Sequence, residues 1–187
     1  HIQSYGQNSL MVALSFQSWV ALEAGQLARA RHLSDAAIDT ARHCGHPFTL
    51  SYGLAFAGWL HTGLGRHEHA RQLLEENLLL AEQQGFHLFH ALSHVFYEIL
   101  SLQTGSTEDP RALADSLDQY VATGASLFMP HFLVAKGQSL LPKGDSAGAR
   151  ACCREARNRI ANSGERWSVK HVEKLEAAIG SVGDNLR

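Results

Sequence analysis

Side chains that commonly bind metal ions recur at helical spacing between residues 87 and 98. They are His87, His90, His94 and Glu98, at intervals of three, four and four residues. Such spacing places them on one face of a helix, where His90, His94 and Glu98 could meet one ion. Zinc sites usually draw ligands from more than one element and need supporting hydrogen bonds, and the sequence shows neither. We therefore predict no metal and no cofactor, and keep these three residues as the alternative contacts of a metal or small-molecule sensor.

Catalytic motifs are absent from the sequence. It contains no GxSxG nucleophile elbow, no GxxxxGK[ST] phosphate loop and no GxGxxG after a strand pattern. The run His67-Glu68-His69 differs from the HExxH zinc motif, because adjacent positions on a helix point apart. We expect a protein that is not an enzyme.

The overall charge disfavours nucleic acid and anionic membranes as partners. The chain of 187 residues has a formal net charge of −2 and a pI of about 6.7, so no basic field surrounds it. Four arginines between residues 150 and 159 leave RNA as a minor alternative, although Glu155 dilutes their charge. No apolar run approaches the roughly 18 to 20 residues of a membrane helix.

Cysteine usage and the N-terminal sequence indicate a cytoplasmic setting. Cys44, Cys152 and Cys153 form no CxxC pair and no disulfide framework, and the adjacent pair is expected to pack inside a helix. The chain shows no signal-peptide pattern. Because it begins with His1, we expect it to be a segment of a longer protein.

A repeated pattern of tryptophan, glycine and alanine organises the chain. Trp19, five residues, a glycine, four residues and an alanine recur from Trp59, 40 residues later. Two glycine series follow the same period along the chain. The first is Gly25, Gly65, Gly105 and Gly144, and the second is Gly45, Gly85, Gly124 and Gly164.

The segments between these glycines are apolar at three- and four-residue spacing, which is typical of amphipathic helices closed by left-handed glycines. We predict an all-α single domain over residues 1–187, built of four helical hairpins and a C-terminal capping helix at about 167–180. The hairpins are expected at about 9–44, 47–84, 88–123 and 128–163. Gly58 and Gly137 lie seven residues before their turn glycines, where the paired helices are expected to be closest.

The third unit departs from the pattern. Gly105 and Gly124 are 19 residues apart rather than 20, and Pro110 is expected in the first turn of the following helix. Glu98 stands where Gly58 and Gly137 stand in their units, so the packing must differ there.

The glycine and alanine spacing resembles the tetratricopeptide repeat, in a variant longer than the usual 34 residues. Phrases such as HPFTLSYGLAFAGWLH from His46, EQQGF from Glu82 and GERW from Gly164 resemble the tetratricopeptide-like C-terminal regions of large bacterial signalling proteins. In that group a cyclase-type or winged-helix domain precedes a predicted ATPase, and the helical repeats follow. The resemblance, over about residues 46–168, implies an α-solenoid that serves as a regulatory interaction module.

Such arrays usually bind partners along the inner face of their first helices, here thirteen, ten, six and three residues before each turn glycine. These positions hold no Arg or Lys, which predicts an apolar groove for a peptide or helix. The predicted groove residues are Ser15, Trp19, Leu22, Tyr52, Trp59, Val95, Ile99, His131 and Gln138.

Three alternatives for the partner stay open. The partner is another protein, another domain of the same polypeptide, or a second copy that makes a homodimer. The tryptophans could instead fill the interior of a tightly coiled array, since large aromatic side chains are buried more often than displayed.

Overall fold

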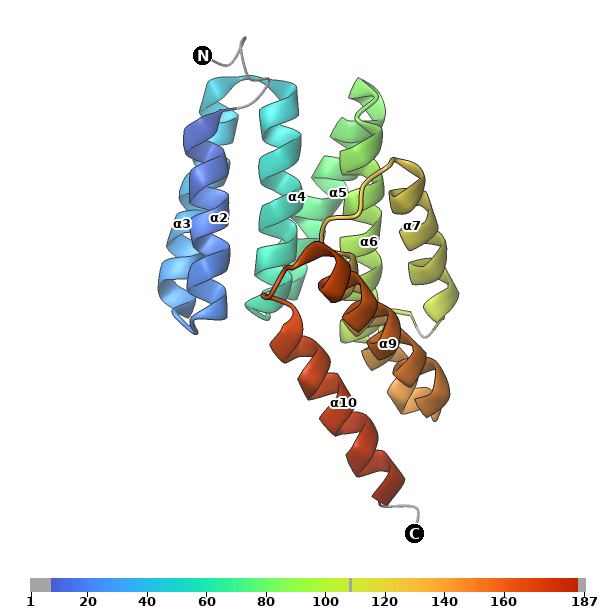
Figure 1. Cartoon of the computed structure of the whole chain (residues 1–187). Coiled ribbons are helices and arrows are strands. Elements are labelled where there is room, and N and C mark those ends of the chain that lie inside the picture. Colours follow the sequence, from blue (N-terminus) through green and yellow to red (C-terminus); the bar gives the residue numbers. More distant parts are fainter. Residues whose placement is uncertain (1–7, 108, 185–187) are drawn as a thin grey trace. The chain divides into compact units, whose positions relative to one another are not determined.

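The structure, a computed structural model, describes residues 8–107 and 109–184, and this part of the chain contains helices and no strand (Figure 1). The prediction of an all-α fold is confirmed. The described helices are α2 (Ser9–Glu23), α3 (Leu27–Cys44), α4 (Pro47–Gly63), α5 (His67–Gln84), α6 (His87–Thr104), α7 (Pro110–Ala122), α8 (Met129–Leu140), the 3-10 turn η1 (Leu141–Lys143), α9 (Ser146–Ser163) and α10 (Val169–Asp184).

Left-handed glycines separate these helices. All eight glycines of the two series have positive φ, between 65° and 82°, as predicted. A residue with a Cβ is strained in this conformation, and glycine is not. Gly45 illustrates the role: its N–H donates to the carbonyl of Arg42 and closes α3. The 40-residue period is therefore a period of helix ends.

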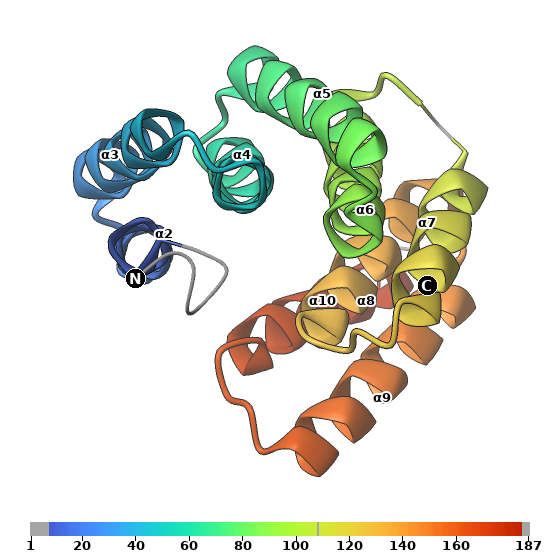
Figure 2. The same ribbon diagram turned by 90° about the horizontal axis from the view of Figure 1, so that it is seen from above.

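The described residues form two compact units, divided between Leu100 and Ser101. The first holds α2 to α5 and most of α6, and the second holds α7 to α10. In the first unit α2 packs on α3, α4 packs on α5, and α4 also contacts α2 and α3 (Figure 2). From α2 to α5, helices that follow one another in the sequence are thus neighbours in space.

Helix α4 is the centre of the first unit. All its residues from 53 to 62 are buried, because the α2–α3 hairpin covers one side and α5 covers another. Leu54 packs with Ile38 of α3 and Leu73 of α5, and Leu60 packs with Ala21 and Ala30 of the first hairpin. A helix that is apolar on every side, as α4 is, is stable only when it is enclosed in this way.

At Gly58, α4 and α5 approach each other closely, as predicted. A Cβ added there would lie 2.6 Å from the Leu74 side chain and 3.5 Å from the carbonyl oxygen of Ala70. Gly137 plays the same part in the second unit, with Cys152 of α9 and Leu175 of α10 as its neighbours.

In the second unit α10 packs on both α8 and α9. Val172, Leu175 and Ile179 of α10 are buried in one cluster with residues of those two helices. Arg157 of α9 reaches Glu176 of α10 with two hydrogen bonds of 3.1 and 2.6 Å. Cys152 and Cys153 are buried free thiols.

Helix α7 begins in the way the sequence predicts. Pro110 occupies its first turn, and the carboxylate of Asp109 accepts a hydrogen bond of 2.9 Å from the N–H of Arg111. Proline suits this position because its missing N–H would lack a helical partner there in any case.

We expect Gly58→Ala to lower the free energy of unfolding by about 1–3 kcal/mol, because the added methyl group forces Leu74 out of its position. Gly180→Ala is the matched control: Gly180 lies in α10 with no atom within 4 Å of its added Cβ. That change should raise stability by about 0.5–1 kcal/mol through helix propensity. Urea unfolding followed by circular dichroism measures both. Equal effects of the two substitutions would contradict the close approach.

Candidate functional site

A continuous group of aromatic rings joins α2, α4 and α6 in the first unit. Each ring centroid lies within 6.5 Å of at least one other. We call this group the aromatic tract; its members are Phe16, Trp19, Phe48, Tyr52, Phe56, Trp59, Phe86, Phe89 and Phe96.

The tract is held by edge-to-face and stacked contacts. The centroids of Trp19 and Trp59 are 3.8 Å apart with their planes at 87°, so the two tryptophans of the repeated motif meet directly. Trp59 also stacks on Phe96 of α6 at 5.0 Å. Tyr52 stacks on Phe56 at 4.5 Å, and its burial raises its pKa to about 12. Such pairs contribute about 0.5–1.5 kcal/mol each beyond the area that they bury.

All seven predicted groove residues of the first unit are buried or half-buried. Ser15, Trp59, Val95 and Ile99 are buried, whereas Trp19, Leu22 and Tyr52 are half-buried. The Ser15 hydroxyl donates to the carbonyl of Met11 at 3.0 Å, which leaves it turned toward its own helix. The structure thus brings Trp19 and Trp59 together and makes the other positions largely part of the packing.

The second unit holds the remaining two groove residues. His131 is half-buried, and its ring stacks on Trp167 with centroids 5.2 Å apart. Gln138 is exposed.

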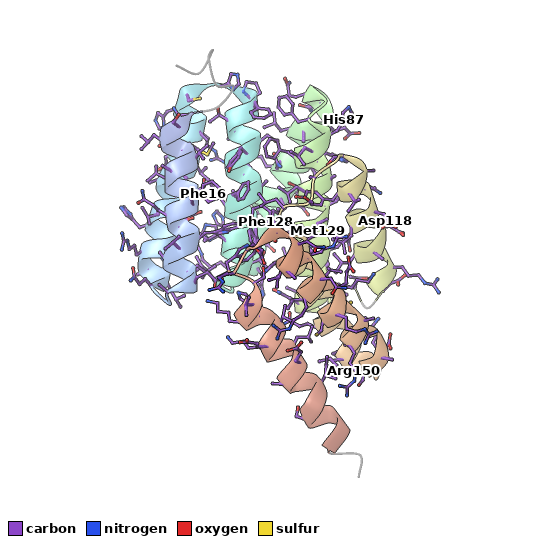
Figure 3. The ribbon with its side chains drawn as sticks, in the orientation of Figure 1. Phe16, His87, Asp118, Phe128, Met129 and Arg150 are labelled. Carbon is purple, nitrogen blue, oxygen red and sulfur yellow. The ribbon has the colours of Figure 1, made fainter. Side chains whose placement is uncertain are left out.

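An apolar stripe lies on the solvent side of α2. Leu10, Phe16 and Val20 are 60%, 46% and 69% exposed, and Ala13 between them is also exposed (Figure 3 labels Phe16). We call these four residues the outer face of α2. Glu23 is the only charged residue of the helix, so no charged side chain interrupts the stripe.

The residues of α4 that are equivalent to the outer face of α2, one repeat later, are packed against neighbouring helices. Adding 40 to the numbers of the outer face gives Leu50, Gly53, Phe56 and Leu60 of α4. Leu60 packs against Ala21 and Ala30, and a Cβ added to Gly53 would lie 3.2 Å from the Cβ of Ala41. In α4 Gly53, Phe56 and Leu60 are buried and Leu50 is half-buried, whereas all four residues of the outer face of α2 are exposed.

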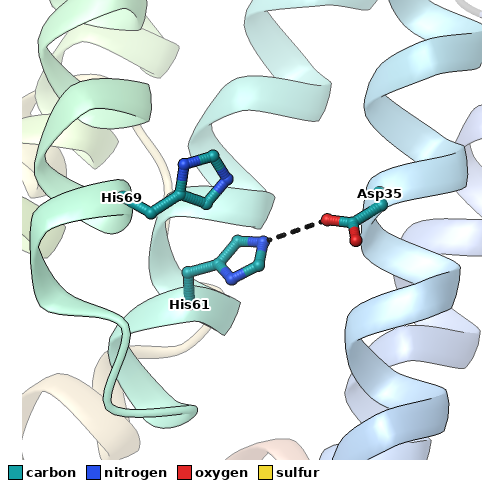
Figure 4. A group of neighbouring side chains, drawn as sticks. All are labelled: Asp35, His61 and His69. Atoms are coloured by element: carbon teal, nitrogen blue, oxygen red, sulfur yellow. Dashed lines mark ion pairs between the residues drawn. The ribbon is translucent and has the colours of Figure 1, made fainter.

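Among the described residues, one group of three metal-binding side chains has its ligand atoms within 4.8 Å of one another. It consists of Asp35, His61 and His69 (Figure 4). The sequence-based set of His90, His94 and Glu98 is not such a group, although the rings of the two histidines lie 4.8 Å apart. Burial lowers the pKa of His94 and raises that of Glu98.

Sequence reasoning missed much of the aromatic tract. Phe48 and Phe56 lie four residues on either side of Tyr52, so their place on its face of α4 could have been inferred. It also missed the outer face of α2, for which the signal is a helix that has apolar residues on all sides and only one charged residue.

A scan of protein-family models finds no match to this chain, and a search of curated proteins finds none either. Within the part of the chain that the structure describes, no helix combines the length and apolar character needed to cross a membrane.

We expect Trp59→Ala to lower the free energy of unfolding by about 3–5 kcal/mol, because Trp59 is only 9% exposed and its loss leaves a cavity between Trp19 and Phe96. Trp19→Ala should cost roughly half as much, since Trp19 is half-buried. Urea unfolding of the two variants compares them. An equal or larger loss for Trp19→Ala would show that Trp19 is as much a part of the core as Trp59.

Proposed function

We propose that this chain is a non-catalytic interaction module, a tetratricopeptide-like α-solenoid of four hairpins with a C-terminal capping helix. It serves as a regulatory segment of a larger bacterial signalling or transcription-regulatory protein in the cytoplasm. The 40-residue period of helix ends and the resemblance of residues 46–168 to such proteins support this assignment. The partner is a protein segment, from another protein or from another domain of the same polypeptide.

The observation that carries the proposal is the outer face of α2. In α4 the equivalent face is covered by a helical hairpin, and the residues that cover it are apolar and include aromatic rings: Phe16, Trp19, Ala21, Ala30, Ile38 and Ala41. The outer face of α2 offers the same kinds of side chain in the same register. Its best-fitting occupant is therefore a helical hairpin of the same pattern.

The chemistry of the outer face agrees with such an occupant. Three large apolar side chains and an alanine run along one side of a 15-residue helix, which suits the length of a packed helix. Apolar patches of this kind on soluble proteins commonly mark interaction surfaces. A basic or acidic peptide would find no charge to pair with along Leu10, Ala13, Phe16 and Val20.

Phe16 connects this surface to the residues of the predicted groove. Its ring contacts Trp19 at 6.2 Å and Phe56 at 6.5 Å, so a helix packed on the outer face would meet the edge of the aromatic tract. Truncation of such aromatic anchors typically costs about 2 kcal/mol or more of binding free energy.

The test uses a labelled synthetic peptide of residues 8–45, which reproduces the α2–α3 hairpin that covers α4. We expect it to bind the full chain, and Val20→Glu in the chain to weaken binding about tenfold or more, because the carboxylate would be buried against apolar atoms. Leu79→Glu is the matched control, since Leu79 is a 58% exposed apolar residue on α5 and should leave binding unchanged. Fluorescence anisotropy measures the binding of the peptide to the unaltered chain, to Val20→Glu and to Leu79→Glu.

Two outcomes would count against this occupant. If Val20→Glu and Leu79→Glu bind the peptide equally, the outer face of α2 is not a hairpin-binding surface. Sedimentation of the chain at several concentrations tests the homodimer. A dimer that Val20→Glu dissociates would mean that a second copy, rather than a hairpin of another segment, covers the face.

A further inference from the structure

Three side chains from three consecutive helices converge in the first unit. Asp35 comes from α3, His61 from the last turn of α4 and His69 from the first turn of α5 (Figure 4). Nε2 of His61 lies 3.6 Å from Oδ1 of Asp35, and the two imidazole rings are 4.6 Å apart at 80°. The group therefore joins the first hairpin to the second.

His61 is the buried member of this group, and its polar atom is unsatisfied. The residue is 0% exposed, and Nε2 is buried without a hydrogen-bond partner although it points toward Asp35. The distance of 3.6 Å is too long for a hydrogen bond. Burial lowers the pKa of His61 to about 4, so at neutral pH the ring is neutral and the contact with Asp35 is not an ion pair. An unsatisfied buried atom of this kind calls for an explanation.

We propose that Asp35, His61 and His69 form a binding site for a divalent transition-metal ion such as zinc. Two imidazole nitrogens and one carboxylate oxygen are a donor set that zinc accepts, with a fourth position left for water or another ligand. Bonds of about 2.0–2.2 Å place two ligands of a tetrahedral ion roughly 3.3–3.5 Å apart, which is close to the observed separation of Asp35 and His61.

The remaining adjustment falls on His69. The ligand atoms of the three residues lie within 4.8 Å of one another, so the nitrogen of His69 must move closer to the other two ligands when the ion binds. His69 is half-buried and Asp35 is exposed, which leaves both free to adjust and leaves the ion in contact with solvent. Burial also lowers the pKa of His69, which favours the neutral form that binds metal.

The positive charge of Arg66 disfavours binding of the metal ion. Its Nη1 lies 3.5 Å from Nδ1 of His61 and donates to it, which leaves the ring proton on Nε2. Metal binding at Nε2 requires this proton to move to Nδ1, and the exposed Arg66 side chain must then turn away. Arg31 adds a second positive charge near His61. Removal of the Arg66 charge should therefore raise the affinity for the metal.

The first measurement is equilibrium dialysis of zinc against the untagged, chelator-treated full chain. We expect one zinc ion per chain, bound at micromolar or lower concentration. His69→Gln and Asp35→Asn should each weaken binding about tenfold or more. Both residues are partly exposed, so these variants are expected to fold. Arg66→Gln should strengthen binding.

His67→Gln is the matched control, because His67 is exposed and lies two residues before His69 on the same helix. It should leave zinc binding unchanged. Zinc should also raise the Tm of the wild-type chain and of His67→Gln, but not that of His69→Gln. The proposal is overturned if the chain retains no zinc at micromolar free zinc. It is equally overturned if His69→Gln and Asp35→Asn bind zinc as the wild type does, which would indicate adventitious binding by other histidines.

Discussion

Burial of each hairpin by the next is the constraint on which this structure depends. No hairpin can enclose its own apolar surface, because two helices cover each other on one side only. Helix α4 shows the satisfied case: residues 53–62 are buried throughout, with α2 and α3 on one side and α5 on another. The small residues Ala30, Gly58 and Ala70 permit this approach, and the two alanines have no exposed surface.

The outer face of α2 is an apolar surface that no neighbouring hairpin covers in the described part of the chain. Val20 is 69% exposed, whereas its counterpart Leu60 is 1% exposed, and the difference lies in what covers them rather than in their chemistry. A repeat protein uses one kind of surface both for its internal stacking and for binding helices from elsewhere. The proposed function follows from that equivalence and needs no reactive group.

The proposed metal site belongs to the same contact between hairpins. Asp35 lies on the first hairpin, and both histidines lie on the second. An ion held by all three would bind only when α3 and the α4–α5 hairpin are packed together, so it would stabilise that packing by mass action. Metal binding and hairpin stacking are therefore coupled in this account, although each has its own test.

The sequence was informative about local structure and less so about contacts between helices. The glycine series predicted the helix ends, because a left-handed residue is a local requirement that glycine meets best. His61 and His69 lie four residues on either side of Gly65, so an antiparallel hairpin brings them face to face, and this signal was available. Asp35 could not be added from sequence, since its place depends on how α3 packs on α4.

The aromatic residues illustrate the same limit. The predicted inner positions placed Trp19 and Trp59 on one face, and the two rings do meet. The inner positions did not predict how far the two tryptophans are buried. Phe56 packs on Trp19 and Phe96 packs on Trp59, and neither phenylalanine is at an inner position. The exposure of a side chain depends on all the residues that pack around it, and a periodic sequence pattern does not identify those residues.

Hydrogen exchange of the backbone amides measures the dependence of each helix on its neighbours most directly. Helices α2 and α4 occupy equivalent places in their hairpins and are of similar length, with 15 and 17 residues. If enclosure by neighbouring hairpins is what stabilises them, amides in the middle of α4 should exchange more slowly by about tenfold or more than those of α2. Equal protection of the two helices, or greater protection of α2, would contradict the account.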